Sequence, residues 1–250
     1  MRFLGSDYDG TLTDGGFTKK KLNAISKWRK AGNLFALVSG RSLWDLVAIP
    51  PKDGFECDYL IANNGAVLAK TDGTVLSAAE CENKVALPLL ETLLELGCMD
   101  IWVTTAFPCR VFADETDCDA PGKYTLGTLP EIPWYTQMCT YCPSFEIAKR
   151  VVSDVKKGFG EYLNPLLNGR NVDIVRWDIN KARGISNLIG LLGINEEDVL
   201  VVGNGENDMD MLAAFRSYAM YNSFESVKEV ADAVTDGVSE LIQLELSKRR

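Results

Sequence analysis

The chain opens with a short, largely apolar run, 2–6 (RFLGS), which ends directly in Asp7-Tyr8-Asp9-Gly10-Thr11. A second, nearly continuous apolar run, 33–38 (NLFALV), ends just as abruptly in Ser39-Gly40-Arg41. Runs of this kind are typical of strands that are buried on both faces of a parallel sheet. In doubly wound sheets, ligands bind at the carboxyl ends of the strands. The two runs therefore predict the type of sheet and the edge at which function is expected.

Helical and strand patterns alternate around these runs. Residues 18–31 have helical spacing of apolar positions and stop at Gly32, and a shorter helix is expected over 42–49, closed by Pro50-Pro51. After Lys181 the same alternation returns, with a buried strand at 199–202. This order of elements predicts an α/β fold built on a doubly wound, mainly parallel sheet.

The middle of the chain has a different pattern. Pairs of expected strands are separated by single helices, at 82–96 and 144–157. Such a pattern indicates a small α+β unit with an antiparallel sheet. We therefore expect residues 1–80 and 178–250 to form one core, with 81–177 inserted into it.

Composition excludes several classes of partner. The 250 residues carry 26 basic and 35 acidic side chains, a formal net charge of −9, which argues against general binding to nucleic acid or to anionic membranes. The longest apolar runs are far shorter than the ~20 residues that span a bilayer, and no secretory signal precedes Asp7. We expect a cytoplasmic protein with no nucleic-acid or membrane partner, and the oligomeric state stays open.

The chain contains no histidine, which removes Ser-His-Asp, Cys-His and HExxH chemistry. The Cys-x5-Arg signature of thiol phosphatases and the GxxxxGK[ST] phosphate loop are also absent from the sequence. Any catalysis must therefore depend on carboxylates, hydroxyls, lysines, amides or a bound metal.

The seven cysteines are odd in number and scattered, as suits a reducing compartment. One pair, Cys139-Thr140-Tyr141-Cys142, forms a CxxC before an expected helix. Such a pair could be redox-active, or half of a zinc site with Cys109 and Cys118. Buried cysteines that serve only as small apolar residues are the commoner case.

Polar groups follow four separate strands or turns of the expected core. They are Asp7 and Asp9, Ser39, Lys181, and the run Asn204–Asp208. Carboxylate and amide oxygens are the ligands that Mg²⁺ prefers, while a hydroxyl and an ammonium can hold phosphate oxygens. Each group alone has an ordinary explanation as a turn, a helix cap or a solvated charge. Their joint occurrence at strand ends favours a functional site.

These segments resemble the motifs of the haloacid dehalogenase superfamily, specifically its Cof-like branch, which has a large insert, the cap, between the second and third motifs. The matching segments are Asp7–Thr13 (DYDGTLT), Val38–Arg41 (VSGR), Lys181 within 179–184 (INKARG), and Gly203–Met211 (GNGENDMDM), with support from 61–66 (IANNGA) and the 222–238 region. The resemblance covers 1–80 and 178–250, whereas the insert is matched only by position and element order.

The resemblance implies a magnesium-dependent phosphatase that acts through an aspartyl-phosphate. Asp7 would be the nucleophile and Asp9 the general acid and base. Mg²⁺ would be held by the Asp7 carboxylate, the Asp9 carbonyl, and Asn204 or Asp208, and Asn207 would support that loop. The implied phosphate-binding groups are Ser39, Gly40, Lys181, Gly10 and Thr11.

One position departs from the family pattern. The superfamily usually has an aspartate at the second place of the fourth motif, where this chain has Asn204. The loss of a charge leaves open a degenerate, non-catalytic phosphate-binding member, and a phosphotransferase or phosphomutase would use the same first half-reaction. The expected substrate is a small phosphomonoester, such as a sugar phosphate or a similar metabolite.

Overall fold

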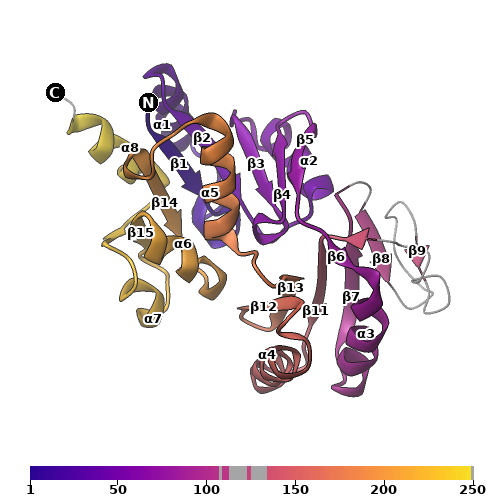
Figure 1. Ribbon diagram of the computed structural model, residues 1–250. Helices are drawn as coiled ribbons and strands as arrows, with labels where there is room; N and C mark the ends of the chain where they lie inside the picture. The colour runs from indigo at the N-terminus through magenta and orange to yellow at the C-terminus, as the bar shows by residue number, and fades with distance from the viewer. Residues whose placement is uncertain (107–108, 113–122, 125–133, 249–250) are drawn as a thin grey trace.

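The computed structural model describes residues 1–106, 109–112, 123–124 and 134–248. Its largest element is an eight-stranded sheet (Figure 1). The strands lie in the order β16 (Ala233–Thr235), β15 (Arg216–Met220), β14 (Val199–Gly203), β1 (Phe3–Ser6), β2 (Leu34–Val38), β3 (Tyr59–Ala62), β4 (Val67–Lys70) and β5 (Val75–Ala78).

All neighbours from β16 to β3 are parallel, and β4 and β5 extend the sheet with antiparallel pairs. Ser6 on β1 is level with Val202 on β14 and with Leu37 on β2. Because the three strands end at almost the same level, the segments that follow them leave the sheet side by side. This register brings the predicted site residues to one edge.

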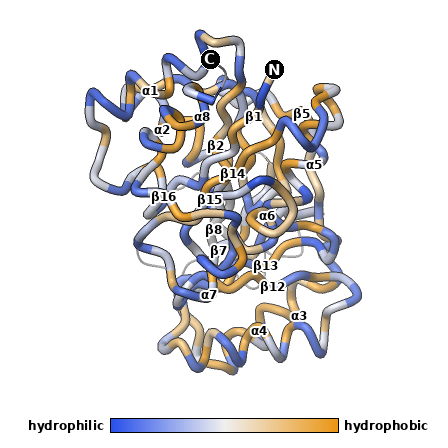
Figure 2. The backbone as a smooth tube through the Cα atoms, turned by 90° about the vertical axis from the view of Figure 1, so that its left-hand side faces the viewer, coloured by the Kyte–Doolittle hydropathy of each residue, from blue (hydrophilic) through white to orange (hydrophobic). Residues whose placement is uncertain are grey.

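Helices cover both faces of the sheet, as Figure 2 shows. One face packs against α1 (Lys19–Lys30), α2 (Leu43–Asp53) and α8 (Val238–Ser247), and the other against α5 (Lys181–Leu192), α6 (Met209–Ala214) and α7 (Glu225–Lys228). The alternating faces of the apolar strands supply both cores, with Leu4 and Leu37 on one side and Phe3 and Val38 on the other. The predicted doubly wound α/β fold is confirmed. No helix in the described part of the chain is long and apolar enough to cross a membrane.

A second sheet is made by the middle of the chain. Its strands lie in the order β12 (Leu163–Asn168), β13 (Asn171–Arg176), β11 (Gln137–Tyr141), β7 (Met99–Thr104), β8 (Cys109–Phe112) and β9 (Lys123–Tyr124), and all its pairs are antiparallel except β8 with β9. The helices α3 (Ala86–Glu95) and α4 (Phe145–Phe159) share one apolar core with this sheet, and β6 (Cys81–Glu82) pairs with β10 (Trp134–Tyr135). We call these elements the second unit; the limits 81–177 stay a prediction.

Two local expectations are wrong. Helix α2 does not end at Pro50-Pro51 but continues to Asp53. A proline lacks the backbone N–H donor, but its carbonyl can still accept a hydrogen bond. The Pro50 carbonyl accepts one from the Gly54 amide, at 3.0 Å. Helix α3 begins at Ala86 rather than at 82, so Pro88 falls in its first turn, where the missing amide has no helical partner to lose. Among the described residues, single turns of helix also lie at Asn63–Gly65, Asn83–Val85, Glu196–Asp198 and Glu206–Asp208, and a kinked turn lies at Tyr8–Leu12.

The first turn of α5 packs directly on the turn that follows β3. A Cβ placed on Gly184 would lie 2.5 Å from the Cα of Gly65 and 2.9 Å from the Ile61 side chain. Gly65 has φ of 101°, and a Cβ placed on it would lie 2.3 Å from the Asn180 carbonyl oxygen. The two backbones are therefore in direct contact, and neither can move away without a shift of the other. Glycine at both places therefore sets how closely the start of α5 approaches the sheet.

We expect Gly184→Ala to lower the free energy of unfolding by about 2–4 kcal/mol, because the added methyl overpacks a backbone contact. Gly190→Ala in the same helix is the matched control, since no atom lies within 4 Å of its added Cβ. That change should raise helix stability by up to about 1 kcal/mol. Denaturant unfolding of both variants measures the difference, and equal stabilities would contradict the packing argument.

Candidate functional site

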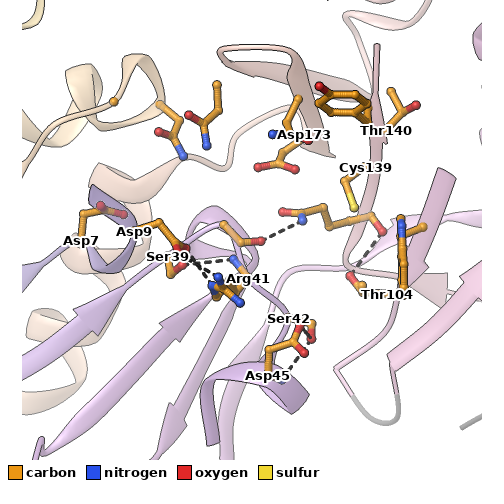
Figure 3. A pocket seen from close by; sticks show the side chains of 18 of the residues that line it. Asp7, Asp9, Ser39, Arg41, Ser42, Asp45, Thr104, Cys139, Thr140 and Asp173 are labelled. Carbon is orange, nitrogen blue, oxygen red and sulfur yellow. Dashed lines mark hydrogen bonds and ion pairs between the residues drawn. The ribbon is translucent and has the colours of Figure 1, made fainter. Parts of the chain in front are cut away.

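A cavity of about 540 Å³ lies between the carboxyl ends of the central strands and the second unit. Figure 3 shows Asp7, Asp9, Ser39 and Arg41 on the side of the first sheet, with Asp173, Cys139 and Thr140 across from them. Among the predicted residues, the cavity wall includes Asp7, Asp9, Ser39, Gly40, Asn204 and Asn207. Two chain regions far apart in sequence thus form one pocket, as expected from the positions of the motifs.

Asp7 is held at the floor of this pocket by a buried lysine. Its amide donates to the Val202 carbonyl, so the residue continues the line of β1, and its side chain is almost fully buried. Lys181, at the first turn of α5, places Nζ 2.8 Å from Asp7 Oδ1 and also donates to Asp208 Oδ1. Lys181 therefore lies behind Asp7, bridging two carboxylates.

The charges of this group determine its protonation. Burial, together with Asp208, raises the pKa of Asp7 to about 7, and the Lys181 ammonium opposes that rise. Burial acts to lower the pKa of Lys181, but the two carboxylates outweigh it and the pKa is raised. The lysine therefore stays charged and favours the ionised form of Asp7, the form that a nucleophile requires.

Both carboxylate oxygens of Asp208 have structural partners. Oδ1 accepts from Lys181, and Oδ2 accepts from the backbone amides of Asn204 and Gly205, each at 2.8 Å. The side chain is 1% exposed and does not line the pocket. Asp208 thus shapes the loop that carries Asn204, and this arrangement favours Asn204 over Asp208 as a direct metal ligand.

The Asn204 amide lies beside the oxygens expected to bind a metal. In the orientation in which its nitrogen donates, that nitrogen is 2.9 Å from the Asp9 carbonyl, 3.3 Å from Asp7 Oδ2 and 2.8 Å from Thr11 Oγ1. The described residues contain no cluster of three or more histidine, cysteine or carboxylate side chains that could hold a metal. In the other orientation of the amide its oxygen occupies this place, and the set of one carboxylate, one carbonyl and one amide oxygen then fits Mg²⁺, which usually takes only one or two protein carboxylates.

Asp9 has a partner that the sequence reasoning missed. Arg41 donates from Nε to Asp9 Oδ2 at 2.7 Å and from Nη2 to Oδ1 at 2.8 Å, a bidentate ion pair at the pocket edge. The group in contact with the Asp9 carboxylate is thus a guanidinium. Since both oxygens are occupied, Asp9 must leave Arg41 before it can donate a proton. The position of Arg41 directly after Ser39-Gly40 was the available signal.

The predicted phosphate-binding groups divide into two sets. Ser39 and Gly40 line the pocket. The Gly10 amide donates to Thr13 Oγ1 and the Thr11 hydroxyl bonds to Asn204, so both are engaged in holding the loop. Neither Gly10, Thr11 nor Lys181 belongs to the described wall of the pocket.

Buried amides and one carboxylate connect the two sheets. Asn64 Nδ2 donates to Asp173 Oδ2 at 2.8 Å and to Gln137 Oε1 at 3.1 Å, and its oxygen accepts from Asn207. Gln137 in turn donates to the Gly40 carbonyl at 3.0 Å. Asn64 lay within a segment that the family resemblance covers, but nothing local in strands β11 and β13 marked Gln137 or Asp173.

The CxxC cysteines do not face each other. Cys139 lines the pocket, whereas Cys142 is buried in the core of the second unit, 3.8 Å in Sγ–Sγ distance from Cys98. Residues three apart at a strand lie on opposite faces, which explains the separation. The side chain of Cys109 and all of Cys118 lie outside the described residues.

Comparison with known proteins identifies the family. The profile of the haloacid dehalogenase-like hydrolases matches residues 4–116 and 130–240, and the chain belongs to that family. The resemblance noted in the sequence is thereby confirmed, as is the expected class of enzyme, a hydrolase of this type.

Relatives with assigned activities support a phosphatase at the level of the family. A 5-amino-6-(5-phospho-D-ribitylamino)uracil phosphatase, YbjI of Escherichia coli, is 22% identical, over 92% of this chain and 89% of its own. A phosphoglycolate phosphatase of Methanopyrus kandleri is 24% identical, over 92% of this chain and 89% of its own.

Solved structures share the whole fold. A haloacid dehalogenase-like hydrolase from B. subtilis superposes with a TM-score of 0.84 at 21% identity, covering 97% of this chain and 99% of its own. A HAD/Cof-like hydrolase from Plasmodium vivax gives 0.83 at 21% identity, covering 100% and 96%. Both sheets of this chain therefore belong to a common architecture.

The buried carboxyl of Asp173 should make the stability of the protein depend on pH. Burial raises the pKa of its carboxyl to about 6, although Asn64 and Lys181 act in the opposite direction. Between pH of about 4 and 6 the folded protein retains a proton that the unfolded chain has lost, so its stability falls as pH rises through this range.

We expect Asp173→Asn to raise the free energy of unfolding at pH 8 by about 1–3 kcal/mol, because the amide has no ionised form to bury. The gain should disappear below pH 4. Denaturant unfolding across this range checks it, with Asp154→Asn on the outer face of α4 as the control. A gain that is independent of pH would contradict the assignment.

Proposed function

We propose that the chain is a magnesium-dependent phosphatase that hydrolyses a small phosphomonoester through an aspartyl-phosphate. The observation that carries this proposal is the setting of Asp7, a buried carboxylate at a pocket floor. One of its oxygens contacts the Lys181 ammonium at 2.8 Å, and the other lies beside Asn204. Family relatives that are phosphatases agree with it. The partner is then a soluble phosphorylated metabolite of the cytoplasm.

In the first half-reaction, an Asp7 oxygen forms a bond to phosphorus while the bond from phosphorus to the alcohol oxygen breaks. Asp9, released from Arg41 and protonated, gives its proton to the departing alcohol. In the second half-reaction, the Asp9 carboxylate takes a proton from water as that water attacks phosphorus. The Asp7 oxygen is then freed, and inorganic phosphate leaves.

Phosphate oxygens would be bound by the Ser39 hydroxyl and by the Gly40 backbone, which line the pocket on the same, core side as Asp7. The residues that would hold Mg²⁺ are Asp7 through Oδ2, Asp9 through its carbonyl and Asn204 through its amide oxygen. When bound, the ion supplies positive charge that offsets repulsion between the Asp7 carboxylate and the phosphate dianion. Lys181 adds a second positive charge behind Asp7.

We further propose that residues 81–177 act as the cap over this site. Gln137 and Asp173 come from that segment and contact the core at Gly40 and Asn64. A wall of this kind excludes water and leaves the chemistry to the core residues. The cap residues that line the pocket would then determine which substrates bind.

We expect Asp7→Asn to reduce kcat at least about a hundredfold, because an amide is a poor nucleophile of nearly the same shape. Turnover of p-nitrophenyl phosphate with Mg²⁺ measures the loss, and denaturant unfolding checks that the variant is folded. Asp154→Asn, which makes the same change on α4 outside the pocket, should keep full activity. A parent enzyme that binds phosphate but never hydrolyses the ester would instead indicate a non-catalytic member.

Asn204→Asp tests the metal ligand. The added carboxylate lies beside Asp7 and strengthens attraction to a divalent ion, so we expect half-maximal activity at a Mg²⁺ concentration lower by about three- to thirtyfold. Asp208→Asn should affect the stability of the loop more than the Mg²⁺ dependence, since its oxygens bind Lys181 and two amides. Activity measured against Mg²⁺ concentration separates the two positions. The opposite pattern would make Asp208 the ligand.

A further inference from the structure

The part of the pocket beyond the phosphate site has a distinct charge. The phosphate end lies on the core side, at Asp7, Ser39 and Gly40, so the alcohol portion of an ester extends toward the second unit. The wall that it meets comes from β7, β11, β12 and β13. Among its described residues are two carboxylates, Asp100 and Asp173, several neutral amides and hydroxyls, and no lysine or arginine.

Asp173 is directed into this space although it is largely buried. The side chain is 8% exposed, and its Oδ2 lies near Gly40, 2.8 Å from where a Cβ on that glycine would be. Asn64 donates to Oδ2 at 2.8 Å, whereas no hydrogen bond to Oδ1 is found among the described residues. A buried carboxylate with one oxygen available toward a cavity is suited to a donor group on a ligand.

The one described cation on the pocket wall does not offset these charges. Arg41 gives two hydrogen bonds to Asp9 and lies beside Asp9 and Ser39, across the pocket from Asp173, so its charge stays at the phosphate end even when Asp9 is released for catalysis. Asp45 adds a further carboxylate on the core side of the wall, where it accepts from the Ser42 hydroxyl. The region available to the alcohol portion is therefore net negative.

We propose that this pocket selects phosphomonoesters whose alcohol portion is uncharged or cationic and rejects those whose alcohol carries a carboxylate or a second phosphate. The proposal rests on the proposed phosphatase function and narrows its substrate class. Asp100 and Asp173 are the specificity-determining residues. An anionic group placed between them meets like charge, and the described wall residues of the second unit include no lysine or arginine to bind it, whereas hydroxyls and amines meet acceptors.

The two relatives illustrate the difference. Glycolate, the alcohol of phosphoglycolate, carries a carboxylate, whereas the ribitylaminouracil ester has hydroxyl and amino groups in its alcohol portion. The charge of this pocket favours the second type. Trp102, which also lines the wall, offers flat apolar surface for such a group, whereas the Tyr141 ring already has the Arg170 guanidinium over it.

The test uses three phenyl phosphates that differ only in the group opposite the ester oxygen: carboxymethyl, hydroxyethyl or aminoethyl. At pH 8 with saturating Mg²⁺, we expect kcat/KM for the carboxymethyl ester to be at least about tenfold below that for the hydroxyethyl ester, and the aminoethyl ester to be hydrolysed at least as well. Added salt should reduce the difference, because it screens charge.

Asp100→Asn and Asp173→Asn should each raise kcat/KM for the carboxymethyl ester relative to the hydroxyethyl ester by about threefold or more. Asp154→Asn removes the same charge from α4, outside the pocket, and should leave the ratio unchanged. Equal hydrolysis of the three esters by the parent, or a ratio that neither pocket variant alters, would overturn the proposal.

Binding separates this proposal from the function on which it rests. Dissociation constants of the three esters are measured on Asp7→Asn, which retains the pocket. If no ester is hydrolysed by the parent but the affinities keep the expected order, the phosphatase proposal fails and the charge selection stands. If the esters are hydrolysed while their affinities and rates are equal, only the charge selection fails.

Discussion

The contact between Lys181 and two buried carboxylates is the constraint on which the rest of the site depends. Asp7 and Asp208 come from the ends of different strands, and without the ammonium between them their charges would repel in a region with little water. Lys181 can take that place only because the start of α5 packs closely on the turn after β3 through two glycines. The position of one helix therefore sets the charge and orientation of Asp7, while Asp208 fixes the loop that presents Asn204.

The type of sheet and its functional edge could be predicted from the sequence, because the residues that indicate them are close together along the chain. An apolar strand followed by Asp7, and another followed by Ser39, already indicate a parallel sheet and its functional edge, and the eight-stranded sheet agrees. Lys181 was expected to bind phosphate, and this role stays a prediction; its full burial behind Asp7 depends on glycine contacts that no spacing in the sequence reveals. Pro50-Pro51 was expected to end a helix, yet the Pro50 carbonyl still accepts and the helix continues to Asp53.

The residues that escaped prediction are those whose partners are distant in sequence. Asp173 stands in a strand between two apolar residues, as many surface carboxylates do, and only its contact with Asn64 brings it to the pocket. Arg41 was visible within a motif, but its pairing with Asp9 depends on how two turns face each other. Local patterns thus predict which elements carry chemistry, whereas the partners within the pocket follow from tertiary packing.

The return of the chain from the second sheet to the core has a consequence for the history of the protein. Only residues 177–180 separate the end of β13 from Lys181, and within them Ile179 is fully buried and Asn180 caps α5. An insertion or deletion here would shift the strand that carries Asp173 and the lysine behind Asp7 together. Length variation among descendants of this sequence is therefore expected to avoid this junction and to accumulate at the outer turns of the second sheet.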